Sequence, residues 1–120
     1  MTAVGYSKGE RGERPWGCWE VLEIGDRYCV KRIDVLPAAR LSLQFHHHRG
    51  EDWMIVEGQG VVERDGQQIA VAGGAHVHVP QGAKHRVTNT GASLLTLIEV
   101  QRGELLDEND IVRLEDDYGR

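Results

Sequence analysis

Turn signals recur at short intervals along this chain, and they limit the elements that can form between them to short strands. Glycine, proline, asparagine and aspartate mark turns near residues 25–26, 37, 65–66, 73–74, 80–82 and 90–91. The apolar-rich segments between them cover residues 19–24, 28–36, 40–48, 53–56, 60–64, 67–71, 76–79, 86–89 and 94–101. About nine short strands at such spacing predict an all-β sandwich or barrel. No segment shows the apolar period of a long helix.

The length and the charge distribution indicate one small domain with an acidic end. A chain of 120 residues with 40% hydrophobic residues can bury a single core. We expect residues 1–13 to be a flexible arm and residues 14–120 to be the folded domain. Residues 104–120 carry 7 acidic and 2 basic side chains, which accounts for the whole net charge of −5. This tail is expected to be a short helix or an extended strap.

The charge distribution, the hydropathy and the cysteine content indicate which partners and which cellular compartment to expect. The rest of the chain is neutral, whereas a nucleic-acid partner normally meets a basic face. No apolar run reaches the roughly 20 residues of a membrane span, and the N-terminus lacks a signal-peptide core. Cys18 and Cys29 suggest reduced thiols of a cytoplasmic protein. The apolar outer faces of residues 41–45 and 94–95 need cover, which predicts a homodimer.

Strict alternation in residues 40–48 places an unusual polar set on one strand face. Leu41, Leu43 and Phe45 share one face of this segment. The opposite face carries Ser42, Gln44, His46 and His48, and Glu51 follows. Such nitrogen and oxygen donors can converge on one ion, with His85, beyond the turn at residues 80–82, as a distant further ligand. His47 has the opposite parity and is expected to face solvent, and His76 and His78 are expected at the rim.

Two spacing patterns extend this observation and resemble the paired motifs of the cupin family. The first runs Ala38, five residues, Gln44, one residue, His46, four residues, Glu51, six residues, Gly58. The second runs Gly74, five residues, Pro80, one residue, Gly82, two residues, His85, three residues, Asn89. The second pattern matches the family motif at each of these positions. In the first, Ala38 stands for the usual glycine and Gln44 for the first histidine.

The motifs favour one ligand set over two alternatives. We expect Gln44, His46, Glu51 and His85 to bind one divalent metal ion. A shifted register would let His48 replace or join one of these ligands, and in a third interpretation the polar residues only line a wet barrel mouth. Mixed amide, imidazole and carboxylate ligation suits Zn²⁺ first, with Mn²⁺, Fe²⁺, Co²⁺ or Ni²⁺ as alternatives.

Beyond these motifs, the chain resembles the cupin domain of type II mannose-6-phosphate isomerase over roughly residues 14–120. The matching stretches are residues 14–17, 30–33, 41–44, 98–101, 110–113 and 115–120, together with His46, His48, Arg49, Glu51 and Trp53. The resemblance implies a single-domain cupin (a double-stranded β-helix or jelly-roll barrel) that interconverts mannose 6-phosphate and fructose 6-phosphate. Many family members also carry a guanylyltransferase domain, for which this chain has no room, and its ending at residues 118–120 suggests a complete domain.

The implied reaction needs a Lewis acid, a general base and a phosphate anchor. The metal ion would supply the first. His48 and Glu99 are the candidate bases, and Arg113 could bind substrate if the tail folds over the site as a lid. The candidates for contacting a hexose phosphate are the polar side chains near the motifs, namely Ser42, Arg49, Lys84 and Arg86, with Arg49 preferred. The alternatives are another metal-dependent cupin enzyme, such as a dioxygenase or other sugar isomerase, and a non-catalytic sugar-phosphate-binding module.

Overall fold

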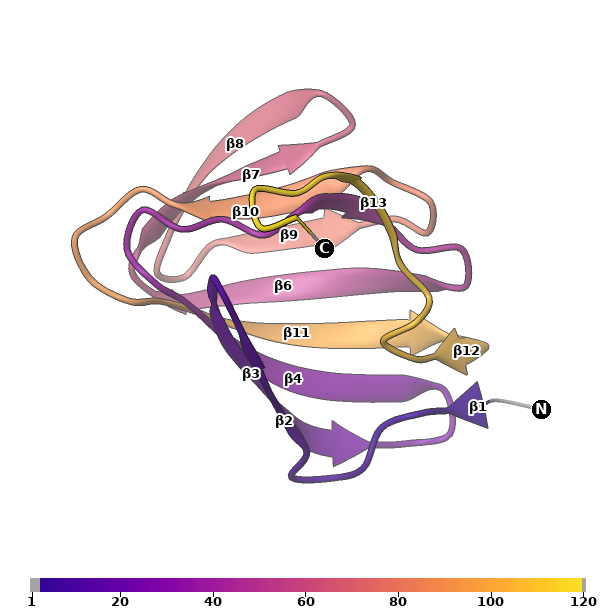
Figure 1. The fold of residues 1–120 in the computed structure, drawn as a ribbon. Helices are drawn as coiled ribbons and strands as arrows, with labels where there is room; N and C mark the ends of the chain where they lie inside the picture. Colours follow the sequence, from indigo (N-terminus) through magenta and orange to yellow (C-terminus); the bar gives the residue numbers. More distant parts are fainter. Residues whose placement is uncertain (1–2, 120) are drawn as a thin grey trace.

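Two antiparallel sheets form the body of the protein in this computed structural model, which describes residues 3–119 (Figure 1). The six-stranded sheet has the order β2 (Arg11–Arg14), β3 (Gly17–Ile24), β4 (Tyr28–Val35), β11 (Leu95–Gly103), β6 (Arg49–Glu57) and β9 (His76–Val79). The five-stranded sheet has the order β13 (Val112–Glu115), β5 (Leu43–Phe45), β10 (His85–Asn89), β7 (Gln59–Arg64) and β8 (Gln67–Ala72). A short parallel pair joins β1 (Ala3–Val4) to β12 (Leu105–Leu106). The all-β prediction is confirmed, and residues 3–119 contain no helix.

The turn chemistry explains how neighbouring strands connect. Asp65 and Gly66 have φ angles of 49° and 83°, so both lie in the left-handed region that a tight hairpin turn requires. This turn joins β7 to β8 in continuous antiparallel register from Gln59↔Ala72 to Arg64↔Gln67. The hairpin predicted from the aspartate–glycine pair is therefore present.

The inner faces of the strands divide the interior into an apolar end and a polar end. Val35, Ile55 and Leu97, on β4, β6 and β11, are almost fully buried and form part of the apolar core. Further along the same inner faces, β6 carries Glu51 and β11 carries Glu99, and both are buried as well. Alternation along each strand thus keeps one side of the sheet inward, while the residue types change from apolar to ionisable.

The N-terminal segment differs from the flexible arm expected for residues 1–13. Arg11–Arg14 forms β2 and pairs with β3, and the Tyr6 side chain is buried against the core. The ring of Tyr6 packs edge-on against Trp19, with 5.9 Å between the ring centroids. This segment therefore belongs to the domain, because its aromatic side chain fills the space beside the sheet. Residues 1 and 2 lie outside the described residues.

The acidic tail is an extended strap and not a helix. It leaves the six-stranded sheet after β11, pairs briefly as β12, and reaches the five-stranded sheet as β13, as the yellow chain in Figure 1 shows. The pairing of β13 with β5 covers that strand's free edge. Leu95, expected on an exposed outer face, is completely buried. The exposed apolar side chains include Met54 and Val56 on the outer face of β6.

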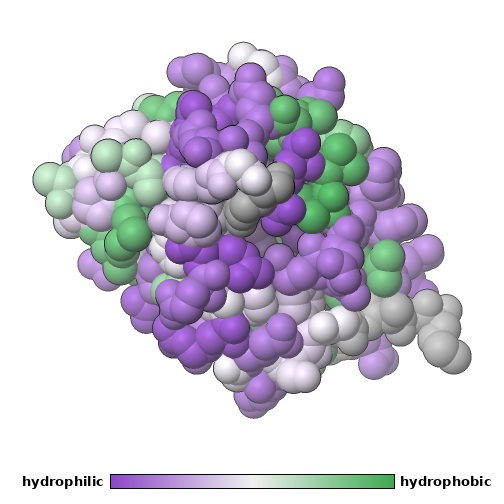
Figure 2. Space-filling view, in the orientation of Figure 1, coloured by the Kyte–Doolittle hydropathy of each residue, from purple (hydrophilic) through white to green (hydrophobic). Residues whose placement is uncertain are grey.

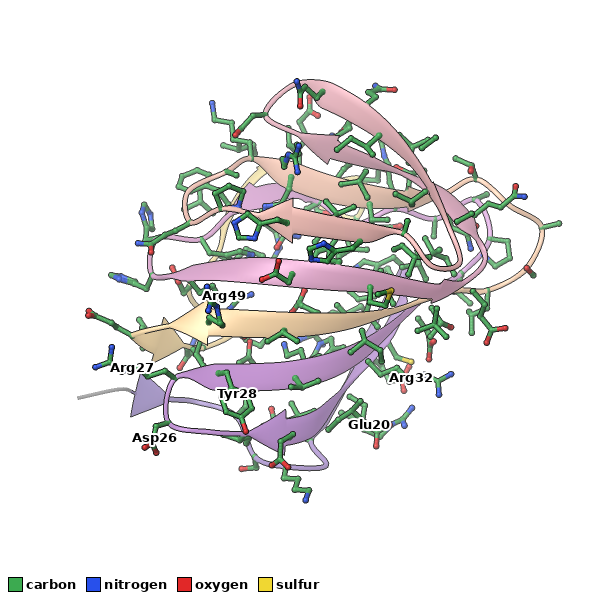
Figure 3. The ribbon with its side chains drawn as sticks, turned by 180° about the vertical axis from the view of Figure 1, so that it is seen from behind. Glu20, Asp26, Arg27, Tyr28, Arg32 and Arg49 are labelled. Atoms are coloured by element: carbon green, nitrogen blue, oxygen red, sulfur yellow. The ribbon has the colours of Figure 1, made fainter. Side chains whose placement is uncertain are left out.

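Figure 3 shows the molecule from behind, with the cross-strand neighbours Glu20 and Arg32 on the same side of β3 and β4. Both side chains are partly or fully exposed, whereas Lys31, next to Arg32, is buried. Neighbouring residues of β4 thus point to opposite faces of the sheet, as the alternation requires. Within residues 3–119, no helix is long and apolar enough to cross a membrane.

Candidate metal centre

Three of the four expected ligands come together at the polar end of the interior. His46 follows β5, Glu51 lies in β6 and His85 begins β10, so three different strands position them. All three side chains are buried, and one ligand atom from each lies within 4.8 Å of the others. Oε2 of Glu51 is 3.4 Å from Nε2 of His46, and Oε1 is 3.7 Å from Nε2 of His85. The spacing motifs therefore identified residues that the fold places next to one another.

Both imidazoles are oriented by backbone carbonyl groups. Nδ1 of His46 lies 2.6 Å from the carbonyl oxygen of Asp110, and Nδ1 of His85 lies 2.8 Å from that of Ala83. A carbonyl oxygen only accepts hydrogen bonds, so each Nδ1 carries a hydrogen and each Nε2 is directed toward Glu51. Burial lowers the pKa of His46 to about 4, which keeps the ring of His46 neutral. Imidazoles oriented in this way are suited to bind a divalent metal ion.

Gln44 lies beside this cluster and can supply a fourth donor. It pairs with His85 across β5 and β10, and it lines the same cavity. Its Nε2 donates to the carbonyl oxygen and the hydroxyl of Ser42, at 3.2 and 3.1 Å. This leaves the amide Oε1 as its possible ligand atom. Together these residues offer the mixed donor set that intermediate divalent ions accept.

Arg49 is engaged with the ligand cluster. Its Nε donates to Oε2 of Glu51 at 2.9 Å, and its Nη1 donates to the carbonyl oxygen of Asp107 at 3.1 Å. Its Nη2 lies 3.4 Å from Nε2 of His46. All three guanidinium nitrogens thus have partners within the protein. Burial alone would raise the pKa of Glu51, but the positive charge of Arg49 holds it well below its ordinary value.

Glu99 is a second buried carboxyl group beside Glu51. It lies on the inner face of β11, where Gln101 donates to its Oε1 at 2.7 Å. Burial, and then the negative charge of Glu51, raise the pKa of Glu99 to about 8. The two neighbouring carboxyl groups therefore differ in proton affinity, because Glu51 has Arg49 beside it.

These side chains line a cavity with a volume of about 60 Å³. Trp16, Trp53 and Ile33 are among its apolar walls. Its charged lining has five cations and three carboxyl groups, namely Arg14, Lys31, Arg49, Arg86, Arg113, Glu51, Glu99 and Glu108. The excess of cations favours an anionic ligand. Figure 2 shows that mainly hydrophilic side chains surround the tail on the face seen in Figure 1.

Of the other predicted site residues, some line the cavity and others lie outside it. Arg113 lines the cavity, and so does Arg86, whose guanidinium is paired with Glu63 and Glu115. Lys84 is exposed and borders a different groove, beside β7 and β13. Ser42 is buried but contacts Gln44 and is not one of the described residues that line the cavity.

The inward direction expected for His48 is not observed, and its side chain is exposed. Strand β5 ends at Phe45, so the alternation that places Gln44 inward does not continue through residue 48. The carboxylate of Asp110 accepts hydrogen bonds from the backbone N–H groups of His47 and His48, both at 3.0 Å. These bonds hold the turn in which both imidazoles face outward.

Sequence reasoning missed Lys31, although a signal was present. Lys31 alternates in β4 with Cys29, Ile33 and Val35, so the apolar pattern already placed it on the inner face. Its partner is Glu108 of the tail, with Nζ 2.5 Å from Oε1. No local pattern connects two residues that are 77 positions apart.

Comparison with known proteins shows the family of the chain. The family model described as "Mannose-6-phosphate isomerase C-terminal" matches residues 6–116. The chain is 48% identical over 107 residues to the xanthan biosynthesis protein XanB of Xanthomonas campestris pv. campestris (strain B100). The aligned region covers 89% of the chain and 23% of XanB. The chain is 46% identical over 107 residues to the mannose-1-phosphate guanylyltransferase of Escherichia coli (strain K12), which covers 89% and 22%. The chain thus spans less than a quarter of the length of these relatives.

Two solved structures share the fold. The capsular polysaccharide assembling protein CapF from Staphylococcus aureus superposes with a TM-score of 0.77 at 23% identity, over 88% of this chain and 34% of CapF. The cupin domain of Cnp3 from Schizosaccharomyces pombe gives a TM-score of 0.69 at 14% identity, over 72% and 64%. At these identities the likeness concerns the arrangement of strands.

Proposed function

Because the chain belongs to the mannose-6-phosphate isomerase C-terminal family of cupin domains, we propose that it interconverts mannose 6-phosphate and fructose 6-phosphate with the help of a divalent metal ion. The observation that carries this proposal is the joint occurrence of a buried His46–Glu51–His85 cluster and a cation-rich cavity lining. The cluster offers a metal site, and the cations favour a phosphorylated sugar over a neutral one.

The donor set fits a bound ion, because each histidine presents Nε2 and Glu51 is ionised. A divalent ion held by Gln44, His46, Glu51 and His85 would act as a Lewis acid toward the sugar oxygens. The isomerisation also moves a proton between C1 and C2 of the sugar. We assign this transfer to Glu99, because it is the carboxyl group of the cavity wall that lies beside Glu51. In this proposal Arg49 holds Glu51 in position and is not the phosphate anchor.

The experiment combines metal analysis with an isomerase assay. Purified protein, loaded separately with Zn²⁺, Mn²⁺, Fe²⁺, Co²⁺ or Ni²⁺, should convert mannose 6-phosphate to fructose 6-phosphate with at least one ion. His85→Ala should lose the metal and the turnover. His78→Ala is the matched control, because His78 is exposed on β9 and outside the cavity. Full activity of His85→Ala without bound metal would contradict the proposal.

A second function, binding of a hexose phosphate without turnover, is supported by one feature of the same site. Arg49 contacts both Glu51 and His46, so part of the ligand set is satisfied within the protein. Tight binding of mannose 6-phosphate with no turnover in the presence of any of the five ions would favour this function.

A further inference from the structure

A carboxylate of the tail occupies a cationic recess in the cavity wall. Oε1 of Glu108 accepts hydrogen bonds from Nζ of Lys31 at 2.5 Å and from the hydroxyl of Tyr6 at 3.0 Å. Its Oε2 lies 3.8 Å from Nη2 of Arg14. The cavity that contains the His46–Glu51–His85 cluster is also lined by Lys31, Arg14 and Glu108. We call the group of Lys31, Tyr6 and Arg14 the anion recess.

Two of the three recess groups are buried and oriented, whereas the side chain of Arg14 is 30% exposed. Lys31 is only 2% exposed and Tyr6 only 6%. Nζ of Lys31 lies 4.0 Å from the ring centroid of Tyr6 and 4.1 Å from that of Trp19, so two aromatic faces hold the ammonium group. A buried ammonium group needs an anion beside it, because an unpaired charge is costly to desolvate.

Glu108 differs from these groups because it is only partly buried. Its side chain is 34% exposed, and it belongs to the turn between β12 and β13 and not to a strand. The recess groups lie on β4 and the N-terminal segment, and that segment is held by the pairing of β1 with β12 and not by Glu108 alone. The side chain of Glu108 can therefore leave the recess while the pairing of β1 with β12 stays in place.

A sugar phosphate matches this site in charge and in position. A phosphate monoester offers the same acceptor oxygens as a carboxylate, with more negative charge. Lys31 and Glu51 lie on the inner faces of β4 and β6, which are separated only by β11, a spacing of about 10 Å between strand axes. This spacing lets the phosphate lie in the recess while C1 and C2, at the other end of the sugar chain, face the metal cluster.

We propose that the anion recess of Lys31, Tyr6 and Arg14 binds the phosphate group of the sugar phosphate, and that this phosphate displaces the carboxylate of Glu108. This inference rests on the proposed function in taking the ligand to be a phosphorylated sugar. The turn at residues 107–110 keeps its other contacts with the cavity wall, from the carbonyl oxygen of Asp107 to Arg49 and from that of Asp110 to His46. The exchange therefore concerns the side chain of Glu108 and not the path of the tail.

The test compares anion binding by three variants of the full chain with that by the unaltered protein. Glu108→Gln removes the competing charge, so inorganic phosphate and mannose 6-phosphate should bind at least about tenfold more tightly, as measured by calorimetry. Lys31→Met should weaken both by a similar factor. Glu104→Gln, an exposed acid of the same tail, is the matched control and should leave both affinities unchanged. Mannose without phosphate should not distinguish the variants.

A double variant keeps the test decisive if Lys31→Met fails to fold with Glu108 left unpaired. Lys31→Met/Glu108→Gln removes both charges, and it should fold while binding phosphate as weakly as we expect for Lys31→Met. Unaltered phosphate affinity in folded Glu108→Gln, or in the double variant, would overturn the recess assignment. Isomerase turnover is scored separately. A failed turnover assay with the expected affinities rejects only the proposed reaction, and normal turnover with unaltered affinities rejects only the recess.

Discussion

The buried ion pair between Arg49 and Glu51 allows a quantitative test of what holds the His46–Glu51–His85 cluster in position. The two side chains are 6% and 2% exposed, and Nε lies 2.9 Å from Oε2. In metal-free protein, Glu51→Gln leaves a buried guanidinium without its counter-charge, and Arg49→Met leaves a buried carboxylate. Each change should lower the free energy of unfolding by about 3–5 kcal/mol. For a domain of this size that corresponds to a decrease in Tm of about 10–20 °C.

The double variant separates pairing from simple loss of packing. Arg49→Met/Glu51→Gln removes both charges and leaves neither unpaired, so it should lose less stability than the sum of the two single losses. Urea unfolding of chelator-treated protein, followed by tryptophan fluorescence and circular dichroism, measures all three free energies. The matched control is the exposed pair of Arg11 and Glu20, at 3.1 Å, whose neutralisation should cost at most about 1 kcal/mol.

Two results would refute this reasoning. The first is strict additivity of the two single changes, which would mean that the charges do not stabilise each other. The second is a loss in each single variant no larger than in the Arg11–Glu20 control. Either result would return Arg49 to the role of a free cation in the cavity, and the phosphate contact first predicted for it would again be the best explanation of its position.

Three further predictions concern the backbone, the tail and the assembly. Ala38 has a φ of 65°, so Ala38→Gly should raise the free energy of unfolding by about 0.5–1 kcal/mol in urea titrations, whereas Ala39→Gly, at an ordinary φ, should lower it. Burial alone would raise the pKa of Glu108, but the ammonium group of Lys31 lowers it below its ordinary value. Ionised Glu108 therefore stabilises the fold above about pH 4.3, and this stabilisation is lost as the pH falls further. The stability difference between the unaltered protein and Glu108→Gln should accordingly shrink on acidification, and a constant difference from pH 7 to pH 3 would contradict the ion pair. We expect a homodimer through the outer face of β6, so Met54→Glu should shift the sedimentation coefficient to that of a monomer, and an already monomeric protein would contradict this.

Local sequence patterns were sufficient to predict the strands and most of the residues around the His46–Glu51–His85 cluster. Alternation through residues 40–46 placed Gln44 and His46 on the inner face, because a strand has a side-chain period of two wherever it continues. The aspartate–glycine pair at residues 65–66 predicted the hairpin correctly, because a tight two-residue hairpin turn needs two successive residues in the left-handed region. No local period connects Gln44 and His46 to His85, so its assignment as a ligand depended mainly on the spacing motifs that resemble a known family.

Tertiary structure decided which charges meet. Whether His48 faces inward depends on where β5 ends, and the carboxylate of Asp110 stabilises the turn that follows. The pairing of Lys31 with Glu108 depends on the path of the tail across the cavity, and nothing near either residue in the sequence encodes it. The physical reason is that side-chain direction follows from the local backbone period, whereas the partner of a buried charge is set by segments that approach only after the two sheets have packed.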